Sequence, residues 1–346
     1  MSDIDIRITG RAGRITLNRP EALNALTEDM SLAIERALRD WSADDAVALV
    51  VFDAAGDKAF CAGGDIAKLY ENGTAGRYGF GQDFWRQEYR MNALIAGYGK
   101  PAVSFLQGFT MGGGVGVGCH ASHRIVCEDS QIAMPECSIG LVPDVGGSYL
   151  LGRAPGRVGE YLGLTSARMS AGDAIHAGFA DHFVPRQDWA GLIATLEAEG
   201  DVRTLGQAAQ DPPVSPLKRD APELDMLFAH DRLEDIVIAC GAAEGAVARA
   251  ATEGMSRNAP LAMACALRLI RDARDGSVER ALRHEFRYTF RAQQQGDFLE
   301  GIRAAIIDRD RRPKWTHLGV ADVTQADVDA MLDPLGDDAL VLGDRP

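Results

Sequence analysis

The sequence predicts an α/β fold in which strands and helices alternate, followed by a mainly helical C-terminal region. Two continuous apolar runs, at residues 47–52 and 101–106, have the composition of strands that are covered on both faces. Glycine turns and helical patterns separate such runs throughout the first two hundred residues. Beyond the proline-rich segment 211–216, almost every pattern is helical. We therefore expect a strand-and-helix core at residues 1–200 and a mainly helical region at residues 201–346.

The N-terminal patterns predict a β-hairpin and then a helix. Residues 4–9 alternate apolar and polar side chains, a glycine-containing turn follows, and residues 14–17 resume the strand pattern. Thr27 precedes two acids and an apolar stripe that runs from Met30 to Trp41. A threonine before acids and an amphipathic stripe is typical of a capped helix start.

The middle of the first half continues the alternation. After the strand at residues 47–52, the Gly-Gly turn at 63–64 leads into a helix, and we assign Asp65 to capping that helix rather than to catalysis. Residues 82–96 have a helical pattern. The strand at 101–106 runs directly into a glycine run at 111–118, and residues 123–127 predict another short strand.

Further along the chain, helices dominate. Residues 170–184 predict a short helix and a strand, and residues 187–198 predict a helix. The final thirty residues are acidic with little periodicity, so we expect part of them to be disordered. We interpret the remaining C-terminal patterns as a helical lid or packing subdomain made of helices at 233–251, 260–274 (with an apolar stripe of Met263, Leu267 and Ile270), 278–295 and 298–307.

Composition excludes several classes of protein. The 346 residues include 50 acids and 36 bases, and the resulting net charge of −14 disfavours nucleic-acid binding. The six cysteines form no CxxC pair, which is typical of reduced thiols. The N-terminus lacks signal-peptide and transit-peptide features, and no apolar run approaches the roughly 18 residues of a membrane span. We therefore expect a cytoplasmic protein with no membrane partner.

Several familiar catalytic motifs are absent from the sequence. It contains no P-loop, no GxGxxG, no GxSxG and no HExxH, since the segment 284–288 has tyrosine at its fifth position. The seven histidines are scattered. We therefore predict neither a metal site nor a Ser-His triad.

What remains is a pairing of glycine turns with carboxylates. Glu136 and Asp144 lie on one short loop that follows the glycine run. Backbone N–H groups near Gly113 and at the Gly63-Gly64 turn could each stabilise a developing oxyanion by roughly 3–4 kcal/mol. The alternative is that the glycines only permit close packing, that Glu136 pairs with a base and that Asp144 forms an Asx turn. The coincidence of both turns with both acids favours a site for acyl-group chemistry.

Four motifs, in order along the chain, resemble the enoyl-CoA hydratase/isomerase (crotonase) superfamily. They are Asn-Arg-Pro with Leu-Asn-Ala-Leu within residues 18–26, Ala-Phe-Cys-Ala-Gly-Gly-Asp-Ile at 59–66, Gly-Phe-Thr-Met-Gly-Gly-Gly at 108–114 and Met-Pro-Glu at 134–136. The resemblance implies a crotonase-like spiral of ββα units with a helical C-terminal subdomain. It also implies that two backbone amides, here those of Gly64 and Gly113, hold a thioester oxygen.

One position departs from the hydratases of that superfamily, which use two glutamates. The first matches Glu136, but the second would stand at Gly116, and Asp144 supplies a different acid. The 3-hydroxyisobutyryl-CoA hydrolase branch is similar here, and it also resembles this chain in Trp-Arg-Gln-Glu-Tyr at 85–89 and in the tail at 296–315. This resemblance covers nearly the whole chain.

The resemblance implies hydrolysis of a short branched β-hydroxyacyl-CoA thioester to the free acid and CoA, and with it valine catabolism. Glu136 would attack the carbonyl or act as base on water, and these alternatives stay open. Asp144 would orient the water or bond the substrate hydroxyl, and Glu88 would contact the substrate. Coenzyme A is part of the substrate, so we expect no separate cofactor. Arg19 and Lys58 flank segments expected near the CoA phosphates, but we keep them out of the site.

Two other functions compete with the hydrolase. An enoyl-CoA hydratase or isomerase would use the same glycine turns, and a noncatalytic acyl-CoA-binding protein would keep the acids for structure. Superfamily members are commonly trimeric, whereas the extended C-terminal region could block or replace those contacts. A homo-oligomer is therefore left open.

Overall fold

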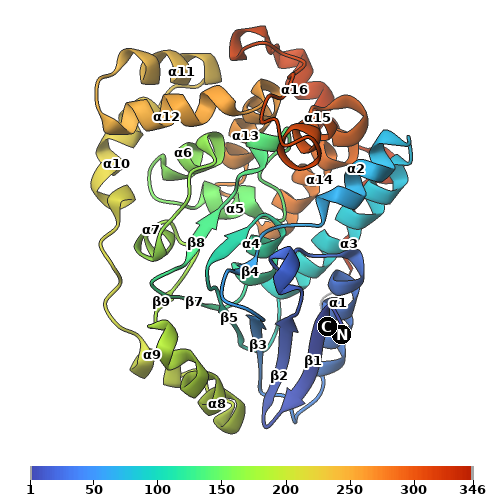
Figure 1. Ribbon diagram of the computed structural model, residues 1–346, viewed down its shortest axis with the longest axis vertical. Helices are drawn as coiled ribbons and strands as arrows, with labels where there is room; N and C mark the ends of the chain where they lie inside the picture. Colours follow the sequence, from blue (N-terminus) through green and yellow to red (C-terminus); the bar gives the residue numbers. More distant parts are fainter. Residues whose placement is uncertain (1, 344–346) are drawn as a thin grey trace.

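Two sheets organise the first half of the chain, and from β3 onward successive strands alternate between them (Figure 1). The structure is a computed structural model that describes residues 2–343. The larger sheet has the order β1-β2-β3-β5-β7-β9 and the smaller has the order β4-β6-β8. The strands are β1 (Ile4–Thr9), β2 (Ala12–Leu17), β3 (Leu49–Ala54), β4 (Ala59–Cys61), β5 (Ala102–Phe105), β6 (Phe109–Met111), β7 (His123–Val126), β8 (Gln131–Ala133) and β9 (His182–Phe183).

The chain path through these sheets is a spiral. The pairs β3 and β4, β5 and β6, and β7 and β8 each place one strand in each sheet before a helical segment follows. The predicted hairpin of β1 and β2 is confirmed as the one antiparallel pair among the named strands of residues 2–343. The sequence analysis did not find β4, β6 and β8, because three residues are too few to show alternation.

Burial on both faces explains the apolar run that becomes β3. Val50 and Phe52 join the large hydrophobic cluster on one side of the sheet, while Leu49 and Val51 join a second cluster with Trp189. Successive strand residues point to opposite faces, so a strand covered on both sides is apolar throughout. The helices of this half are α1 (Glu28–Ser42), α2 (Ile66–Thr74), α3 (Tyr78–Ala96), α4 (Gly113–Gly118), α5 (Gly147–Gly152), α6 (Val158–Thr165), α7 (Ala171–His176) and α8 (Trp189–Glu199).

Two capping predictions have different outcomes. The Thr27 hydroxyl accepts a hydrogen bond from Met30 N at 3.3 Å at the start of α1, as predicted. Asp65 stands at the N-cap position of α2, but its side chain accepts no bond from that helix. Instead Asp65 Oδ2 pairs with Arg19 Nη2 at 3.1 Å, so the assignment to capping was wrong.

The C-terminal helices differ from their predicted bounds in three places. They are α9 (Thr204–Ala208), α10 (Pro216–Leu227), α11 (Leu233–Ala242), α12 (Ala246–Arg257), α13 (Pro260–Asp272), α14 (Val278–Gln295), α15 (Phe298–Ile302) and α16 (Gln325–Leu332). The predicted helix at 233–251 is broken at Gly245, whose φ is +136°. The helix α10 starts at Pro216, the last residue of the proline-rich segment 211–216, because a first helical position tolerates proline. The predicted helix at 298–307 continues from α15 as a π-helical turn.

The acidic tail is ordered as far as Gly343, so the expectation of disorder was wrong for those residues. Val328 and Met331 of α16 are buried, and α16 packs against α13 and α14. Two buried apolar side chains on one face of this helix dock the segment despite its charge. Residues 344–346 lie outside the described part of the chain.

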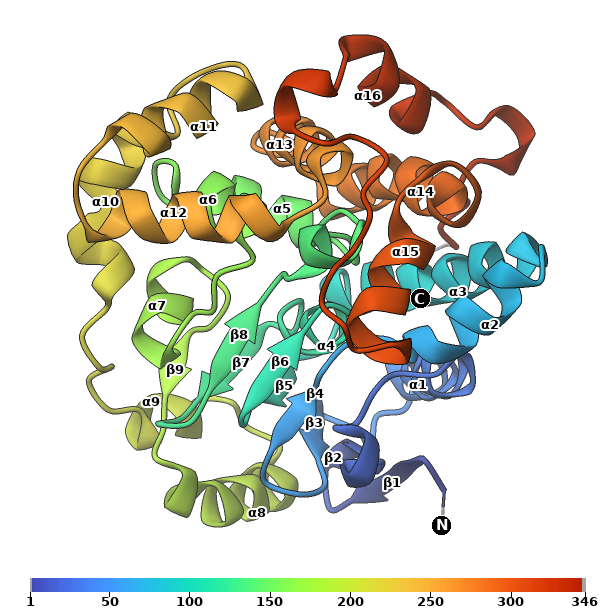
Figure 2. The same ribbon diagram turned by 45° about the horizontal axis from the view of Figure 1, so that its top comes forward.

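The C-terminal helices share the core of the spiral. One cluster of buried side chains includes Phe52 of β3, Trp85 of α3, Phe286 of α14 and Phe298 of α15. Figure 2 shows α14 and α15 beside α2 and α3, and α14 packs directly on α3. The division at residue 200 stays a prediction. All six cysteines are buried and free, and within residues 2–343 no helix has both the length and the apolar character to span a membrane.

Candidate active site

All five predicted site residues line one cavity of about 100 Å³. Gly64 follows β4, Gly113 begins α4, and Glu88 comes from α3. Glu136 begins a 3-10 turn after β8, and Asp144 lies on the loop before α5. The rest of the wall is mainly apolar and includes Ile66, Leu69, Phe84, Trp85, Leu141, Val145 and Phe298. Glu136 and Asp144 therefore belong to the same site.

The two glycine bends lie against each other. A Cβ atom placed on Gly113 would be 3.3 Å from Gly64 N and 2.6 Å from Glu88 Oε1, so only glycine fits there. Gly112 has φ +48° and Gly63 has φ +119°, which other residues rarely adopt. Among residues 2–343, neither Gly64 N nor Gly113 N donates a hydrogen bond. Two free N–H donors thus sit at one end of the cavity.

The three acids are buried without cations. Glu88, Glu136 and Asp144 are 2%, 5% and 4% exposed. No ion pair within residues 2–343 involves any of them. Glu88 Oε1 and Glu136 Oε2 also have no hydrogen-bond partner there. A buried acceptor without a partner is costly, so these two atoms are available to a bound molecule.

Burial raises the pKa of all three acids. Loss of solvent raises the pKa of Glu136 and of Glu88 well above the usual carboxyl range, and the charge of Asp144 raises both further. Loss of solvent also raises the pKa of Asp144, to about 7, although a hydrogen bond from Tyr89 lowers it. Repulsion by the charge of Asp144 is the smaller cause for Glu88 and Glu136. In the structure desolvation is the larger cause, and it raises the pKa of all three acids.

Tyr89 and Glu285 are residues that the sequence analysis missed. The Tyr89 hydroxyl donates to Asp144 Oδ2 at 2.7 Å. Tyr89 belonged to the Trp-Arg-Gln-Glu-Tyr motif, so its neighbour Glu88 was a signal that could have identified it. Glu285 of α14 accepts a hydrogen bond from Gly146 N at 2.7 Å and lies far from the loop in sequence, so no pattern pointed to it.

The position of the missing glutamate is closed. A Cβ atom on Gly116 would lie 2.6 Å from Asn92 Nδ2 and 2.8 Å from Val145 Cβ. Gly116 is buried in α4 and does not line the cavity. A second glutamate therefore has no room at this position unless Asn92 and Val145 move.

A larger hollow of about 820 Å³ adjoins the cavity, since Met111 and Pro135 line both. Its rim includes Arg168, Arg257 and Arg311, and its wall includes Trp315. Arg257 pairs with Glu253, whereas Arg311 has no acidic partner within residues 2–343. In a chain of net charge −14, these cations make a local site for an anionic group. Arg19 is instead occupied by Asp3 and Asp65.

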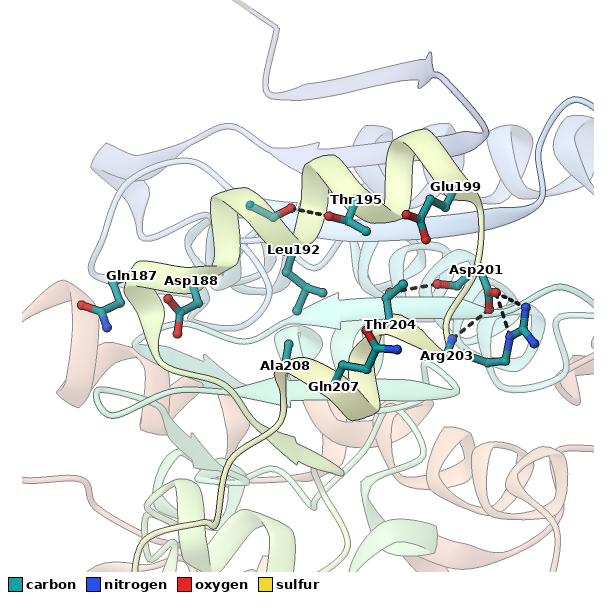
Figure 3. A pocket seen from close by; sticks show the side chains of 11 residues that line it. Gln187, Asp188, Leu192, Thr195, Glu199, Asp201, Arg203, Thr204, Gln207 and Ala208 are labelled. Atoms are coloured by element: carbon teal, nitrogen blue, oxygen red, sulfur yellow. Dashed lines mark hydrogen bonds and ion pairs between the residues drawn. The ribbon is translucent and has the colours of Figure 1, made fainter.

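A separate hollow of about 850 Å³ lies between α8 and α9, as Figure 3 shows. None of the five predicted residues lines it. Its guanidinium, Arg203, is paired with Asp201. None of the described residues that line this hollow has an unpaired buried polar atom that points to a ligand, so we assign it no function.

The chain belongs to the enoyl-CoA hydratase/isomerase family, because the model of that family matches residues 12–332. It is also similar to the mitochondrial 3-hydroxyisobutyryl-CoA hydrolase of Danio rerio, with 36% identity over 99% of this chain and 92% of that protein. The Xenopus laevis protein of the same name is 37% identical over 94% of this chain and 88% of its own length. The predicted branch and the prediction of an enzyme are confirmed.

Two solved structures have the same fold. A crystal structure named as an enoyl-CoA hydratase from Rhodobacter sphaeroides is 55% identical, with a TM-score of 0.95 over 98% of this chain and 100% of that one. One named as a carnitinyl-CoA dehydratase from Mycobacterium thermoresistibile is 39% identical, with a TM-score of 0.95 over 99% of both chains. The predicted crotonase-like spiral with a helical C-terminal part is thereby confirmed.

The prediction of a cytoplasmic location is contradicted. The animal relatives are named as mitochondrial proteins. The prediction relied on the composition of the first residues. That composition is a poor guide to location when relatives that match nearly the whole chain are named as mitochondrial.

Proposed function

We propose that this protein hydrolyses a short branched β-hydroxyacyl-CoA thioester, 3-hydroxyisobutyryl-CoA, to the free acid and CoA. The names of the relatives from Danio rerio and Xenopus laevis support this substrate. The observation that favours hydrolysis over hydration is the closed position at Gly116, together with Asp144 in the cavity wall. A place in valine catabolism rests on the same names and goes with this proposal.

The size of the cavity supports a short acyl group. About 100 Å³ is enclosed by Trp85, Phe84, Leu69 and Phe298, and the rings of Trp85 and Phe298 lie 5.6 Å apart. A long acyl chain would have to displace these packed rings. The unpartnered Glu88 Oε1 faces this space and suits the hydroxyl group of a β-hydroxyacyl substrate.

The Gly64 and Gly113 amides would bind the thioester oxygen. Negative charge develops on that oxygen when the carbonyl carbon is attacked, and preorganised N–H donors stabilise it by roughly 3–4 kcal/mol each. Among the described residues neither N–H group donates a hydrogen bond, and a Cβ atom on Gly113 would lie only 3.3 Å from Gly64 N. The mostly apolar wall strengthens such interactions by excluding water.

Two routes to the products use the same acids. In the first, Glu136 attacks the carbonyl carbon, the C–S bond breaks, the thiolate takes a proton, and water then cleaves the mixed anhydride. In the second, the ionised carboxylate of Glu136 takes a proton from water as the water attacks the thioester carbon directly, the C–S bond then breaks, and the leaving thiolate takes that proton from Glu136. Asp144 would orient the water in either route. Intact mass of Asp144→Asn after rapid mixing with substrate distinguishes them, since only the first route leaves an acyl group on the protein.

The arginine-rimmed hollow would receive the CoA arm. Guanidinium groups bind phosphate oxygens through paired N–H donors, and an indole ring offers a face for adenine. Arg311 and Trp315 provide these groups next to the catalytic cavity. They come from the tail motif that the sequence analysis found specific to the hydrolase branch.

A hydratase is the second candidate, because the structure from Rhodobacter sphaeroides that is 55% identical bears that name. A hydratase must place and activate water across a C=C bond, and the glutamate expected at Gly116 is lacking. One experiment decides among the candidates. Thiol release from 3-hydroxyisobutyryl-CoA supports the hydrolase, loss of the conjugated absorbance of crotonyl-CoA supports the hydratase, and binding without either supports an acyl-CoA-binding protein.

A further inference from the structure

The loop between Asp144 and α5 has an unfavourable backbone. Val145 has φ +54°, although a β-branched side chain rarely adopts a positive φ. The following residue, Gly146, has φ +79° and cannot accept a side chain, because a Cβ atom would lie 2.5 Å from His120 Nε2. Such a conformation is strained and persists only when surrounding groups hold it in place. Asp144 and Val145 both line the catalytic cavity, so the strained backbone of Val145 directly follows the acid Asp144.

Glu285 is the main group that holds this loop. Its Oε2 accepts from Gly146 N at 2.7 Å, and its Oε1 accepts from Ser148 N at 3.0 Å and from the Ser148 hydroxyl. Glu285 itself is fully buried on α14. A second contact comes from the other side, where His120 Nε2 bonds to Val145 O at 2.8 Å.

Glu285 does not line the cavity and cannot touch the substrate there. A helix cap alone would need only the donors at the start of α5, and most caps accept from a single N–H group. Here three donors from residues 146–148 converge on one carboxylate, which fixes the backbone directly after Val145. The helix α14 also supplies Thr289, whose hydroxyl is 3.5 Å from the Tyr89 oxygen that bonds Asp144.

We infer that Glu285 is a positioning residue, which sets the direction of Asp144 by locking Val145 in its left-handed conformation. This inference rests on the proposed function in one respect: the position of Asp144 matters for turnover only if the protein is a hydrolase. The C-terminal helix α14 then positions a catalytic group through Glu285, in addition to covering the core.

Glu285→Gln tests the inference. A glutamine offers one acceptor oxygen, and its NH2 group opposes the N–H donors, so the loop loses part of its anchor. We expect kcat for 3-hydroxyisobutyryl-CoA to fall roughly 100-fold, because a shift of about 1 Å in a catalytic group has such an effect, while KM stays within about twofold. A variant with a lower Tm and wild-type kcat would overturn the inference.

Two further variants make the test independent of folding losses. Val145→Gly adopts the positive φ without strain, so the Glu285→Gln effect on kcat should be about tenfold smaller in that background. An equal effect in both backgrounds would contradict the role of Val145. If Glu285→Gln does not fold, Ser148→Ala removes only the hydroxyl donor and should lower kcat about threefold at unchanged KM. Wild-type kcat in Ser148→Ala would then count against the inference.

Glu160→Gln is the matched control. Glu160 is as buried as Glu285, but it pairs with Arg157 and Arg274 away from the cavity. This variant should lower Tm and leave kcat within about twofold. If the wild-type protein releases no thiol from 3-hydroxyisobutyryl-CoA, the proposed function fails. The φ of Val145 in a crystal structure of Glu285→Gln then still decides whether Glu285 holds the loop.

Discussion

The hydroxyl of Tyr89 donates a 2.7 Å hydrogen bond to Oδ2 of Asp144, and both side chains are buried. This bond lowers the pKa of Asp144 against the effect of burial, which raises it to about 7. Within residues 2–343 no tyrosine hydroxyl bonds to Glu88 or Glu136, and burial raises the pKa of each well above the usual range. Asp144 is therefore the acid of the three that ionises most readily.

Removing the tyrosine hydroxyl should move the pH dependence of turnover. In Tyr89→Phe the ionised form of Asp144 loses its donor, so its pKa rises and the acid limb of kcat moves to higher pH. A hydrogen bond to a charged group contributes about 1.5–3 kcal/mol, which corresponds to about 1–2 pH units. The measurement is a pH–rate profile of thiol release at saturating substrate.

Tyr288→Phe serves as the control for this profile. Its hydroxyl is also buried and donates to Gly140 O at 3.0 Å, but it makes no bond to an acid. Its profile should match the wild type. Equal shifts in the two variants would mean that the bond to Asp144 has no special effect.

Glu136→Gln should abolish turnover and stabilise the fold at alkaline pH. The raised pKa of Glu136 means that the folded state holds a proton which the unfolded state releases, so stability falls as pH rises above about 4.5, the ordinary glutamate value. The amide has no charge to desolvate. Tm should thus exceed the wild-type value at about pH 9 and match it at about pH 4, with about 2–4 °C gained for each kcal/mol.

Thermal unfolding of Glu136→Gln at both pH values checks the direction of this change in Tm. Glu160→Gln is measured under the same conditions as the control. Glu160 has arginine partners, so its removal leaves charges unpaired and should lower Tm. Measurable turnover by Glu136→Gln, or a lower Tm at alkaline pH, would remove Glu136 from its proposed role.

A side chain at position 116 should destabilise the protein. Gly116→Ala places a methyl group 2.6 Å from Asn92 Nδ2 and 2.8 Å from Val145 Cβ, so we expect a loss of about 1–3 kcal/mol in urea unfolding. Gly241→Ala is the control, because no atom lies within 4 Å of its added methyl and alanine favours the helix α11. If Gly116→Ala is as stable as this control, the argument against a second glutamate is lost.

Arg311→Ala should weaken recognition of the CoA arm. We expect KM for the acyl-CoA to rise about tenfold with little change in kcat, and KM for the matching acyl-pantetheine to stay the same. Arg309→Ala is the control, since Arg309 lies two residues away with a similar φ but does not line the hollow. If KM rises for both the acyl-CoA and the acyl-pantetheine, Arg311 does not act by binding the CoA phosphates.

Local sequence patterns predicted much of the fold, because burial and helix capping constrain residues that are close together in the chain. The continuous apolar run of β3 and the Thr27 cap were both visible in the sequence, since burial on two faces and a single hydroxyl are local requirements. The break at Gly245 and the docking of α16 were not. Each depends on packing between segments that are distant along the chain.

The candidate site shows the same difference between features that local sequence predicts and features that depend on distant segments. The glycine turns and the acids, with the family resemblance, pointed to Gly64, Gly113, Glu136 and Asp144, which line one cavity together with Glu88, a residue that the resemblance alone supplied. Glu285 was invisible because its partners lie well over a hundred residues upstream. The closure of Gly116 by Asn92 likewise needed coordinates, because the sequence shows only which residue is missing.

The shared packing of Phe298 and α14 with the spiral has a consequence for synthesis. A nascent chain that has left the ribosome as far as β9 already contains every acid and amide assigned to the reaction, yet the α14 and Phe298 side of the pocket has still to be synthesised. The enzyme therefore becomes competent only when its last third has emerged, and a prematurely terminated product would be inert.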